Sequence, residues 1–219
     1  MLKLWLKIKI YLPWLLRVGL FLAIPYSVYV SDYLFIFGAI TALVISLLPA
    51  YWRRSRHASL PFDLELLVSL ALFVHIILGE IFRFYDDKWY FDKIMHFYGT
   101  AIIALLAFLT VFTLHWSKKI KLSLPLMAYF TVIFSMAVGA FWEIGEFVID
   151  QVFGRNTQYS LENTMWDLIF NFVGGSIAAI FAVLYTRRKN QQQLGELLGP
   201  VRKILELQED QGSLPKGHL

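Results

Sequence analysis

Two pairs of polar residues, each spaced four apart, occur in otherwise apolar segments. Asp92 and His96 form the first pair, and Asp167 and Asn171 form the second. Residues four apart lie on one face of an α-helix, so each pair presents its side chains in one direction. A carboxylate beside an imidazole is a ligand combination for divalent metals, although buried ion pairs share this spacing. The pattern therefore predicts either a metal site or a buried ion pair.

Three further acids, Glu143, Glu146 and Asp150, follow at i, i+3 and i+7 within one apolar segment. This spacing places them on a common helix face. A carboxylate in the bilayer centre that faces lipid costs several kcal/mol, so this face must meet other helices, a cation or a water-filled cavity. We therefore expect Glu143 and Glu146, together with Asp92 and His96, to form the catalytic group of an active site.

Glu80 ends another apolar segment and, like the three acids, lies near a predicted helix C-terminus, where the helix dipole disfavours negative charge. Arg83, Arg155, a metal ion or protonation could offset these charges. Carboxylate oxygens with one imidazole suit several ions. The predicted metal ligands are His96, Glu146, Asp92, Asp167 and Glu80, and the candidate ions are Zn²⁺, Mn²⁺, Fe and Mg²⁺.

Some of these acids have a structural alternative as helix-start residues. Asp92 and Asp167 fall in the predicted first turns of two helices, where the dipole favours an acid, and Thr164 is a candidate cap for the second helix. Asp63 and Glu65 also begin a predicted helix, and for them we favour this capping role over a functional one. The sequence leaves Asp92 and Asp167 open between the two roles.

These residues are carried by long apolar segments. Of the 219 residues, 58% are hydrophobic and 16% are charged, whereas soluble domains carry about 25% charged residues. Apolar runs of about 20 residues can cross a bilayer as helices. We predict an all-α, polytopic transmembrane bundle of six spans, and the absence of cysteine excludes disulfides and thiolate metal sites. The spans lie near residues 11–30, 33–52, 66–85, 94–116, 122–149 and 165–185.

Basic clusters occur on alternate sides of these spans, at residues 3–9, 53–56, 118–121 and 187–189. The positive-inside rule predicts that both termini are cytoplasmic and that the acidic cluster lies on the outer side of a bacterial inner membrane. Topology thus explains the basic isoelectric point of about 9.2, and we expect no nucleic-acid partner. We divide the chain into two N-terminal spans with a cytoplasmic loop (1–60), a four-helix core with the cluster (61–186) and a partly amphipathic cytoplasmic tail (187–219).

The last four spans contain a candidate internal repeat. The segment DKIMHFYGTAIIA that starts at Asp92 aligns with DLIFNFVGGSIAA from Asp167, and Gly79-Glu80 aligns with Gly145-Glu146. The paired helices enter the membrane in the same sense, so we expect a parallel two-helix repeat about an axis near the membrane normal. Chance similarity in an apolar composition is the alternative.

The same segments resemble a known family. The stretches DKIMHF, FWEIGE and RNTQYSLENTMWDLIFNFVGG are similar to bacterial YjdF-type inner-membrane proteins and to the broader VanZ-like pattern. The resemblance covers about residues 61–182 and implies functional positions that include Arg155 and Asn171, which we expect to bind substrate. Glu146 stands where VanZ-like proteins often have Gln, so a VanZ role does not transfer directly.

Three functions are compatible with this pattern. The first is a metal-dependent protein that binds or acts on an amphiphilic substrate, such as a lipid-linked phosphate, beside membrane lipids. The second is a cation- or proton-coupled transporter, which the candidate repeat and the intramembrane acids favour. The third is a structural membrane protein whose polar groups tie helices together. The sequence does not decide whether the protein is an enzyme, nor its oligomeric state.

Overall fold

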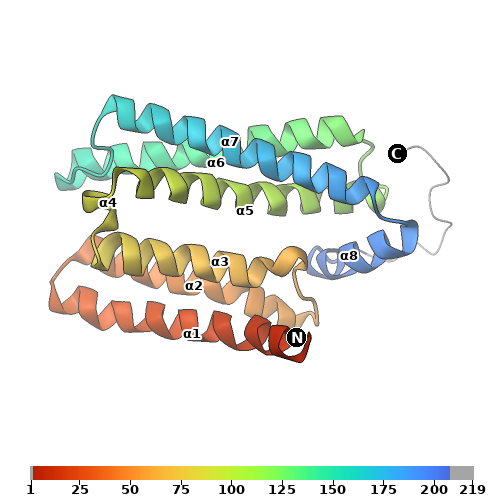
Figure 1. Ribbon diagram of the computed structural model, residues 1–219, viewed down its shortest axis with the longest axis horizontal. Coiled ribbons are helices and arrows are strands. Elements are labelled where there is room, and N and C mark those ends of the chain that lie inside the picture. The colour runs from red at the N-terminus through yellow and green to blue at the C-terminus, as the bar shows by residue number, and fades with distance from the viewer. Residues whose placement is uncertain (1, 208–219) are drawn as a thin grey trace. The chain divides into compact units, whose positions relative to one another are not determined.

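Helices form every regular element of the described part of the chain, residues 2–207 of this computed structural model, with side chains from residue 11 on (Figure 1). Six of them are long and apolar enough to span a membrane, so the predicted all-α class with six spans is confirmed. The tail beyond residue 207 lies outside the described residues. The spans are Tyr11–Tyr29, Tyr33–Ser55, Pro61–Ile81, Trp89–Trp116, Leu124–Phe153 and Leu161–Arg187.

The chain forms two compact units. The first runs to Phe91 and includes residues 203–205; the second takes residues 92–202 and the remainder. The three functional domains predicted from the sequence divide the chain differently, and they stay a prediction. The helices are α1 (Leu2–Tyr29), α2 (Tyr33–Ser55), η1 (Pro61–Asp63), α3 (Leu64–Phe73), η2 (Val74–Ile81), α4 (Phe84–Asp87), α5 (Trp89–Trp116), α6 (Leu124–Phe153), α7 (Leu161–Arg187) and α8 (Gln191–Ile204).

In the first unit, α1, α2 and α3 pack together, and small side chains permit the contact. Leu20 and Ala23 of α1 meet Ala39 and Ala42 of α2 in a fully enclosed apolar cluster, which Ile76 completes. Asp32 caps α2 by accepting a hydrogen bond from the Phe35 amide at 3.1 Å, as expected for an acid at a helix start. Helices α1 and α2 therefore form a close antiparallel pair.

The third span continues beyond α3 as the π-helix η2 and ends at Ile81, four residues before the predicted end. His75 in this π-helix is 2.6 Å from the Tyr85 hydroxyl through Nδ1. The Tyr85 ring lies against Gly79, where a Cβ atom would overlap it. The π-helix and this tyrosine end the span early.

In the second unit, α7 packs against both α5 and α6 through glycine. A Cβ at Gly174 would overlap the carbonyl oxygen of Phe97 on α5, and one at Gly175 would overlap Ser135 Oγ on α6. These two glycines let α7 approach both neighbouring helices closely. Gly99 has no such role, because a Cβ there would meet nothing within 4 Å.

Helix α7 begins at Leu161, earlier than the sequence indicated, and its cap is Ser160 rather than Thr164. The Ser160 hydroxyl accepts a hydrogen bond from the Asn163 amide at 3.1 Å. Asp167 therefore lies in the second turn, where it cannot serve as the cap. The C-terminal helix α8 buries one stripe of apolar side chains, those of Leu194, Leu198 and Val201, so this stripe is covered by protein.

Candidate functional site

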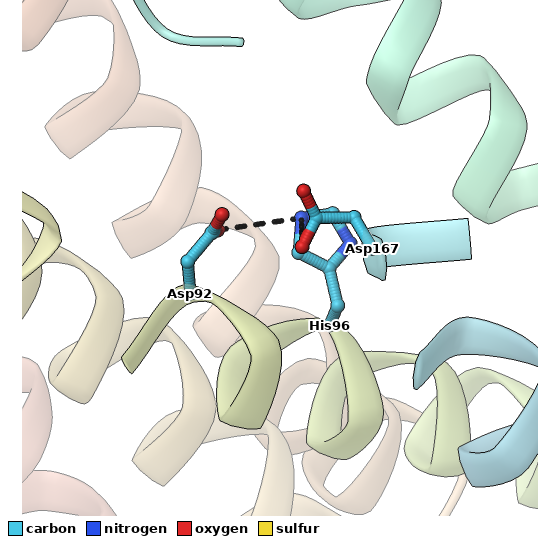
Figure 2. A group of neighbouring side chains, drawn as sticks. All are labelled: Asp92, His96 and Asp167. Atoms are coloured by element: carbon cyan, nitrogen blue, oxygen red, sulfur yellow. Dashed lines mark ion pairs between the residues drawn. The ribbon is translucent and has the colours of Figure 1, made fainter. Parts of the chain in front are cut away.

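Asp92, His96 and Asp167 come together in the second unit (Figure 2). Asp92 and His96 are one turn apart near the start of α5, and Asp167 reaches them from α7. One ligand-type atom from each residue lies within 4.8 Å of the other two. All three side chains are buried, and Asp167 has no exposed surface. Two parallel helices thus place an imidazole between two carboxylates.

His96 directs Nε2 at three carboxylate oxygens. The distances are 3.4 Å to Asp92 Oδ1, 3.4 Å to Glu143 Oε1 and 3.7 Å to Asp167 Oδ1. An N–H···O hydrogen bond spans about 2.7–3.2 Å, so none of the three distances corresponds to a direct hydrogen bond. One imidazole nitrogen therefore faces carboxylates from α5, α6 and α7.

The other imidazole nitrogen of His96 faces Asn171. Nδ1 lies 3.3 Å from Asn171 Oδ1, and the Thr100 hydroxyl donates to the same oxygen at 2.5 Å. An amide oxygen can only accept, so this contact favours the tautomer with the proton on Nδ1. A neutral His96 then presents the unprotonated Nε2 to the carboxylates. Such a partner for the outer nitrogen is the usual arrangement at a metal-ligating histidine.

Lys93 is a member of the cluster that sequence reasoning missed. Its ammonium lies 3.0 Å from Asp92 Oδ2 and 2.7 Å from Asp167 Oδ1, and it donates to Asn163 Oδ1 at 2.8 Å. Asn163 in turn donates through Nδ2 to Asp92 Oδ2 at 3.1 Å and to Asp167 Oδ2 at 2.7 Å. Lys93 and Asn163 therefore hold both aspartates in place beside His96.

The cluster carries more negative than positive charge. Asp92, Asp167 and Glu143 contribute three carboxylates, whereas Lys93 contributes one ammonium, which leaves a formal charge of −2 with neutral His96. Buried charges are costly unless they are paired or coordinate a metal. A divalent cation has the charge that would balance this set.

Glu143 is the carboxylate that α6 contributes to the cluster. Its side chain is 5% exposed, and neither oxygen has a hydrogen-bond partner among the described residues. A buried carboxylate without a donor is unfavourable, so its presence calls for a ligand or proton at this position. Gly139, one turn earlier on α6, leaves the space that the Asn171 side chain occupies.

The remaining acids of α6 have other surroundings. Glu146 Oε1 accepts a hydrogen bond from Trp142 Nε1 at 2.8 Å, and Glu146 is not part of the three-residue group. Asp150 accepts from Thr157 N at 2.7 Å, Thr157 Oγ1 at 2.7 Å and Gln158 N at 3.0 Å. These donors offset the charge of Asp150 without a cation. The same hydrogen bonds hold the loop between α6 and α7 against the end of α6.

Two predicted residues lie elsewhere. Arg155 is exposed in the loop between α6 and α7. Glu80 is exposed in η2 of the first unit. The structure thus brings Asp92, His96, Glu143, Asp167 and Asn171 together, and ligand roles for Glu80 and Glu146, like substrate binding by Arg155, stay predictions.

Comparison with known proteins places the chain in a family. A family model described as "Predicted membrane protein (DUF2238)" matches residues 12–188, which include all six spans almost completely and the whole cluster. The chain belongs to the DUF2238 family. An uncharacterized protein of Thermotoga maritima is 34% identical over 129 residues, which cover 58% of this DUF2238 chain and 65% of the relative. No solved structure matches the chain. Membership supports a multi-pass membrane protein, while the YjdF-type and VanZ-like resemblances stay predictions.

Proposed function

We propose that this DUF2238 protein holds one divalent metal ion at Asp92, His96 and Asp167, and acts on an amphiphilic phosphate at the membrane surface. The observation that carries the proposal is the position of His96 Nε2, which faces three carboxylate oxygens at 3.4–3.7 Å. A neutral His96 would direct the lone pair of Nε2 at these anionic oxygens, and a cation between them would stabilise that arrangement.

The spacing of these atoms fits a small tetrahedral ion. Zinc bonds of about 2.0–2.2 Å separate neighbouring ligand atoms in a tetrahedron by about 3.3–3.6 Å. The distance from His96 Nε2 to Asp92 Oδ1, 3.4 Å, lies in this range, and the distance to Asp167 Oδ1, 3.7 Å, is slightly longer. Three protein ligands with an open fourth position are typical of catalytic zinc sites, whereas structural sites use four.

The residues around the ligands have complementary roles in this proposal. A divalent ion would supply Lewis-acid assistance to a phosphoryl oxygen and activate water. Glu143 is the proton acceptor, because its carboxylate faces the site and has no other hydrogen bond. Lys93 and Asn163 fix the two aspartates, and Asn171 fixes the tautomer of His96.

Exposed aromatic residues next to the cluster support a lipid-linked substrate. Trp142 directly precedes Glu143, Trp166 directly precedes Asp167, and both are half-exposed. Tyr159 of the loop between α6 and α7 is exposed as well. Trp and Tyr concentrate at the headgroup level of a bilayer. These aromatic residues support a position of the cluster at the headgroup level, where lipid phosphates are found. The positive-inside rule predicts that this level belongs to the outer leaflet of a bacterial inner membrane.

A cation- or proton-coupled transporter is the second candidate, and buried polar atoms beyond the cluster favour it. Asn171 Nδ2 and Thr131 Oγ1 have no hydrogen-bond partner among the described residues, and each residue is 1% exposed. Thr131 precedes Glu143 by twelve residues on α6, and both residues are buried. Enclosed water at these atoms would extend the polar region into the membrane.

The test compares metal content and lipid composition for the wild type and Glu143→Gln. We expect stoichiometric metal in both purified proteins, because Glu143 is not a ligand in this proposal. Intact-lipid mass spectrometry of membranes should show a changed phospholipid or lipid-linked phosphate with the wild type only. Glu162→Gln is the matched control, since Glu162 is an exposed acid on α7 and should change neither readout.

Three outcomes are informative. Metal without lipid turnover, accompanied by cation or proton flux in vesicles, would favour the transporter. Absence of metal from the wild type would remove the basis of the catalytic proposal. A large loss of melting temperature in Glu143→Gln without metal would instead indicate that the cluster only ties helices together.

A further inference from the structure

The first unit contains a second buried charge cluster, formed by Arg17, Glu65 and Arg53 from three helices. Arg17 Nη2 lies 3.1 Å from Glu65 Oε1, and Arg53 Nη1 lies 2.7 Å from Glu65 Oε2. Arg17 also donates to the Ser46 carbonyl through Nε at 3.0 Å and Nη2 at 2.6 Å. Glu65 thus pairs with two arginines, in addition to the helix-start role that its position predicts.

One carboxylate divided between two guanidinium groups leaves one positive charge in this triad. The charge is enclosed, because the Arg17 side chain is 3% exposed and that of Glu65 is 13% exposed. The Arg17 guanidinium also lies over the Trp14 ring, 5.0 Å from its centroid. This contact attracts a cation but supplies no negative charge. The missing partner of the triad is therefore an anion.

Arg17 and Ser69 each have a buried polar atom that lacks a hydrogen-bond partner within the described part of the chain. Arg17 Nη1 and Ser69 Oγ make no hydrogen bond to any described residue. Ser69 has no exposed surface and lies one turn after Glu65, on the same face of α3. Buried donors are paired in the great majority of cases, so these two groups call for an acceptor that the protein does not provide.

We propose that Arg17, Arg53 and Ser69 form a binding site for a phosphate-class oxyanion. Arginine is the preferred residue for phosphate because its planar N–H groups match phosphate oxygens. Arg53 provides access, since its side chain is 32% exposed and uses only one donor on Glu65. It also belongs to the basic segment that flanks the second span. A phospholipid headgroup and free phosphate share this chemistry. A lipid phosphate would approach from the end of the second span, where Arg53 lies.

The test measures binding of two probes to the delipidated protein in neutral detergent. The probes are inorganic phosphate and phosphatidylglycerol, with phosphatidylcholine as the lipid without net charge, and native mass spectrometry with thermal shift gives the affinities. Arg53→Gln should weaken binding at least about tenfold, as for a lost charged hydrogen bond. Arg54→Gln is the matched control: it removes the same charge from the adjacent, exposed residue.

Glu65→Gln is an independent variant that should change anion affinity in the opposite direction. It removes the competing carboxylate and frees donors of both arginines, so anion binding should become tighter. Selective phosphatidylglycerol binding with this order of affinities identifies a lipid headgroup, and the same order with inorganic phosphate alone identifies a free anion. Equal losses in the two arginine variants, or no binding of either probe, would overturn the proposal.

Discussion

Lys93 supplies a positive charge beside both Asp92 and Asp167, which are buried in the second unit. Its ammonium contacts one oxygen of each, and His96 Nε2 faces the other oxygen of Asp92 but the same oxygen of Asp167. Neighbouring residues on a helix do not share a face, so the sequence Asp92-Lys93 gave no indication that both belong to one cluster. The flexible four-carbon stem of lysine overcomes this angle. By contrast, the i, i+4 spacing of Asp92 and His96 was sufficient to predict their common face.

Replacement of Lys93 by Ala should destabilise the metal-free protein by about 3–5 kcal/mol, because two buried carboxylates lose their ammonium partner. Added Zn²⁺ or Mn²⁺ should restore much of this stability, since the ion supplies positive charge at the same carboxylates. Thermal unfolding with and without chelator measures both effects. Lys88→Ala, at an exposed position, is the control. A melting temperature that does not respond to metal in Lys93→Ala would count against the site.

At the scale of elements, glycine contacts and one loop position the residues of the cluster. Hydropathy was sufficient to predict the six spans, because apolar length decides which segments cross a bilayer. It did not reveal the π-helix η2 or the start of α7 at Leu161, since both depend on local hydrogen bonds. Hydropathy also did not reveal the role of Asp150. Its partners, Thr157 and Gln158, lie in a loop, and helix periodicity does not predict the path of a loop.

Gly174→Ala should destabilise the second unit by about 1–3 kcal/mol and separate α7 from α5, because the added methyl group would overlap the Phe97 carbonyl. Metal affinity should fall with it, since Asp167 is on α7. Gly99→Ala is the control, because its Cβ position is open and alanine favours a helix by up to about 1 kcal/mol. Equal stability of the two variants in thermal unfolding would contradict this packing.

Asp150→Ala should loosen the loop between α6 and α7, because it removes three hydrogen bonds to one carboxylate. We expect a loss of about 1–3 kcal/mol and faster proteolysis within residues 154–160, with metal still bound. Limited proteolysis and metal analysis on one preparation provide the measurement. Loss of the metal with an otherwise intact fold would instead make Asp150 part of the site.

At the scale of the whole molecule, two sequence predictions concern symmetry and orientation. The predicted repeat equates Asp92 with Asp167 and His96 with Asn171. In the second unit these equivalent residues meet, because Lys93 contacts both aspartates and His96 Nδ1 is 3.3 Å from Asn171 Oδ1. A twofold axis between α5 and α7 would produce such contacts. The equivalence of Glu80 and Glu146 reaches into the other unit and stays a prediction.

Reporter fusions test the orientation. The basic residues of segments 53–56 and 118–121 predict a cytoplasmic location for these loops, so fusions after Trp89 and Gln158 should report the outer side. A fusion after Asn190 should report the cytoplasm. A cytoplasmic signal after Gln158 would place the cluster at the inner leaflet, and the outer-leaflet substrate would have to be abandoned.

The central claim is that a metal ion is bound at His96 between Asp92 and Asp167. X-ray absorption spectroscopy at the metal edge of the purified protein tests it most directly, because it identifies the ligand atoms. We predict one imidazole nitrogen with oxygen ligands at about 2.0–2.2 Å, and loss of the nitrogen signal or of the metal in His96→Ala. A wild-type protein that retains no metal, or a metal shell without an imidazole, would contradict the account.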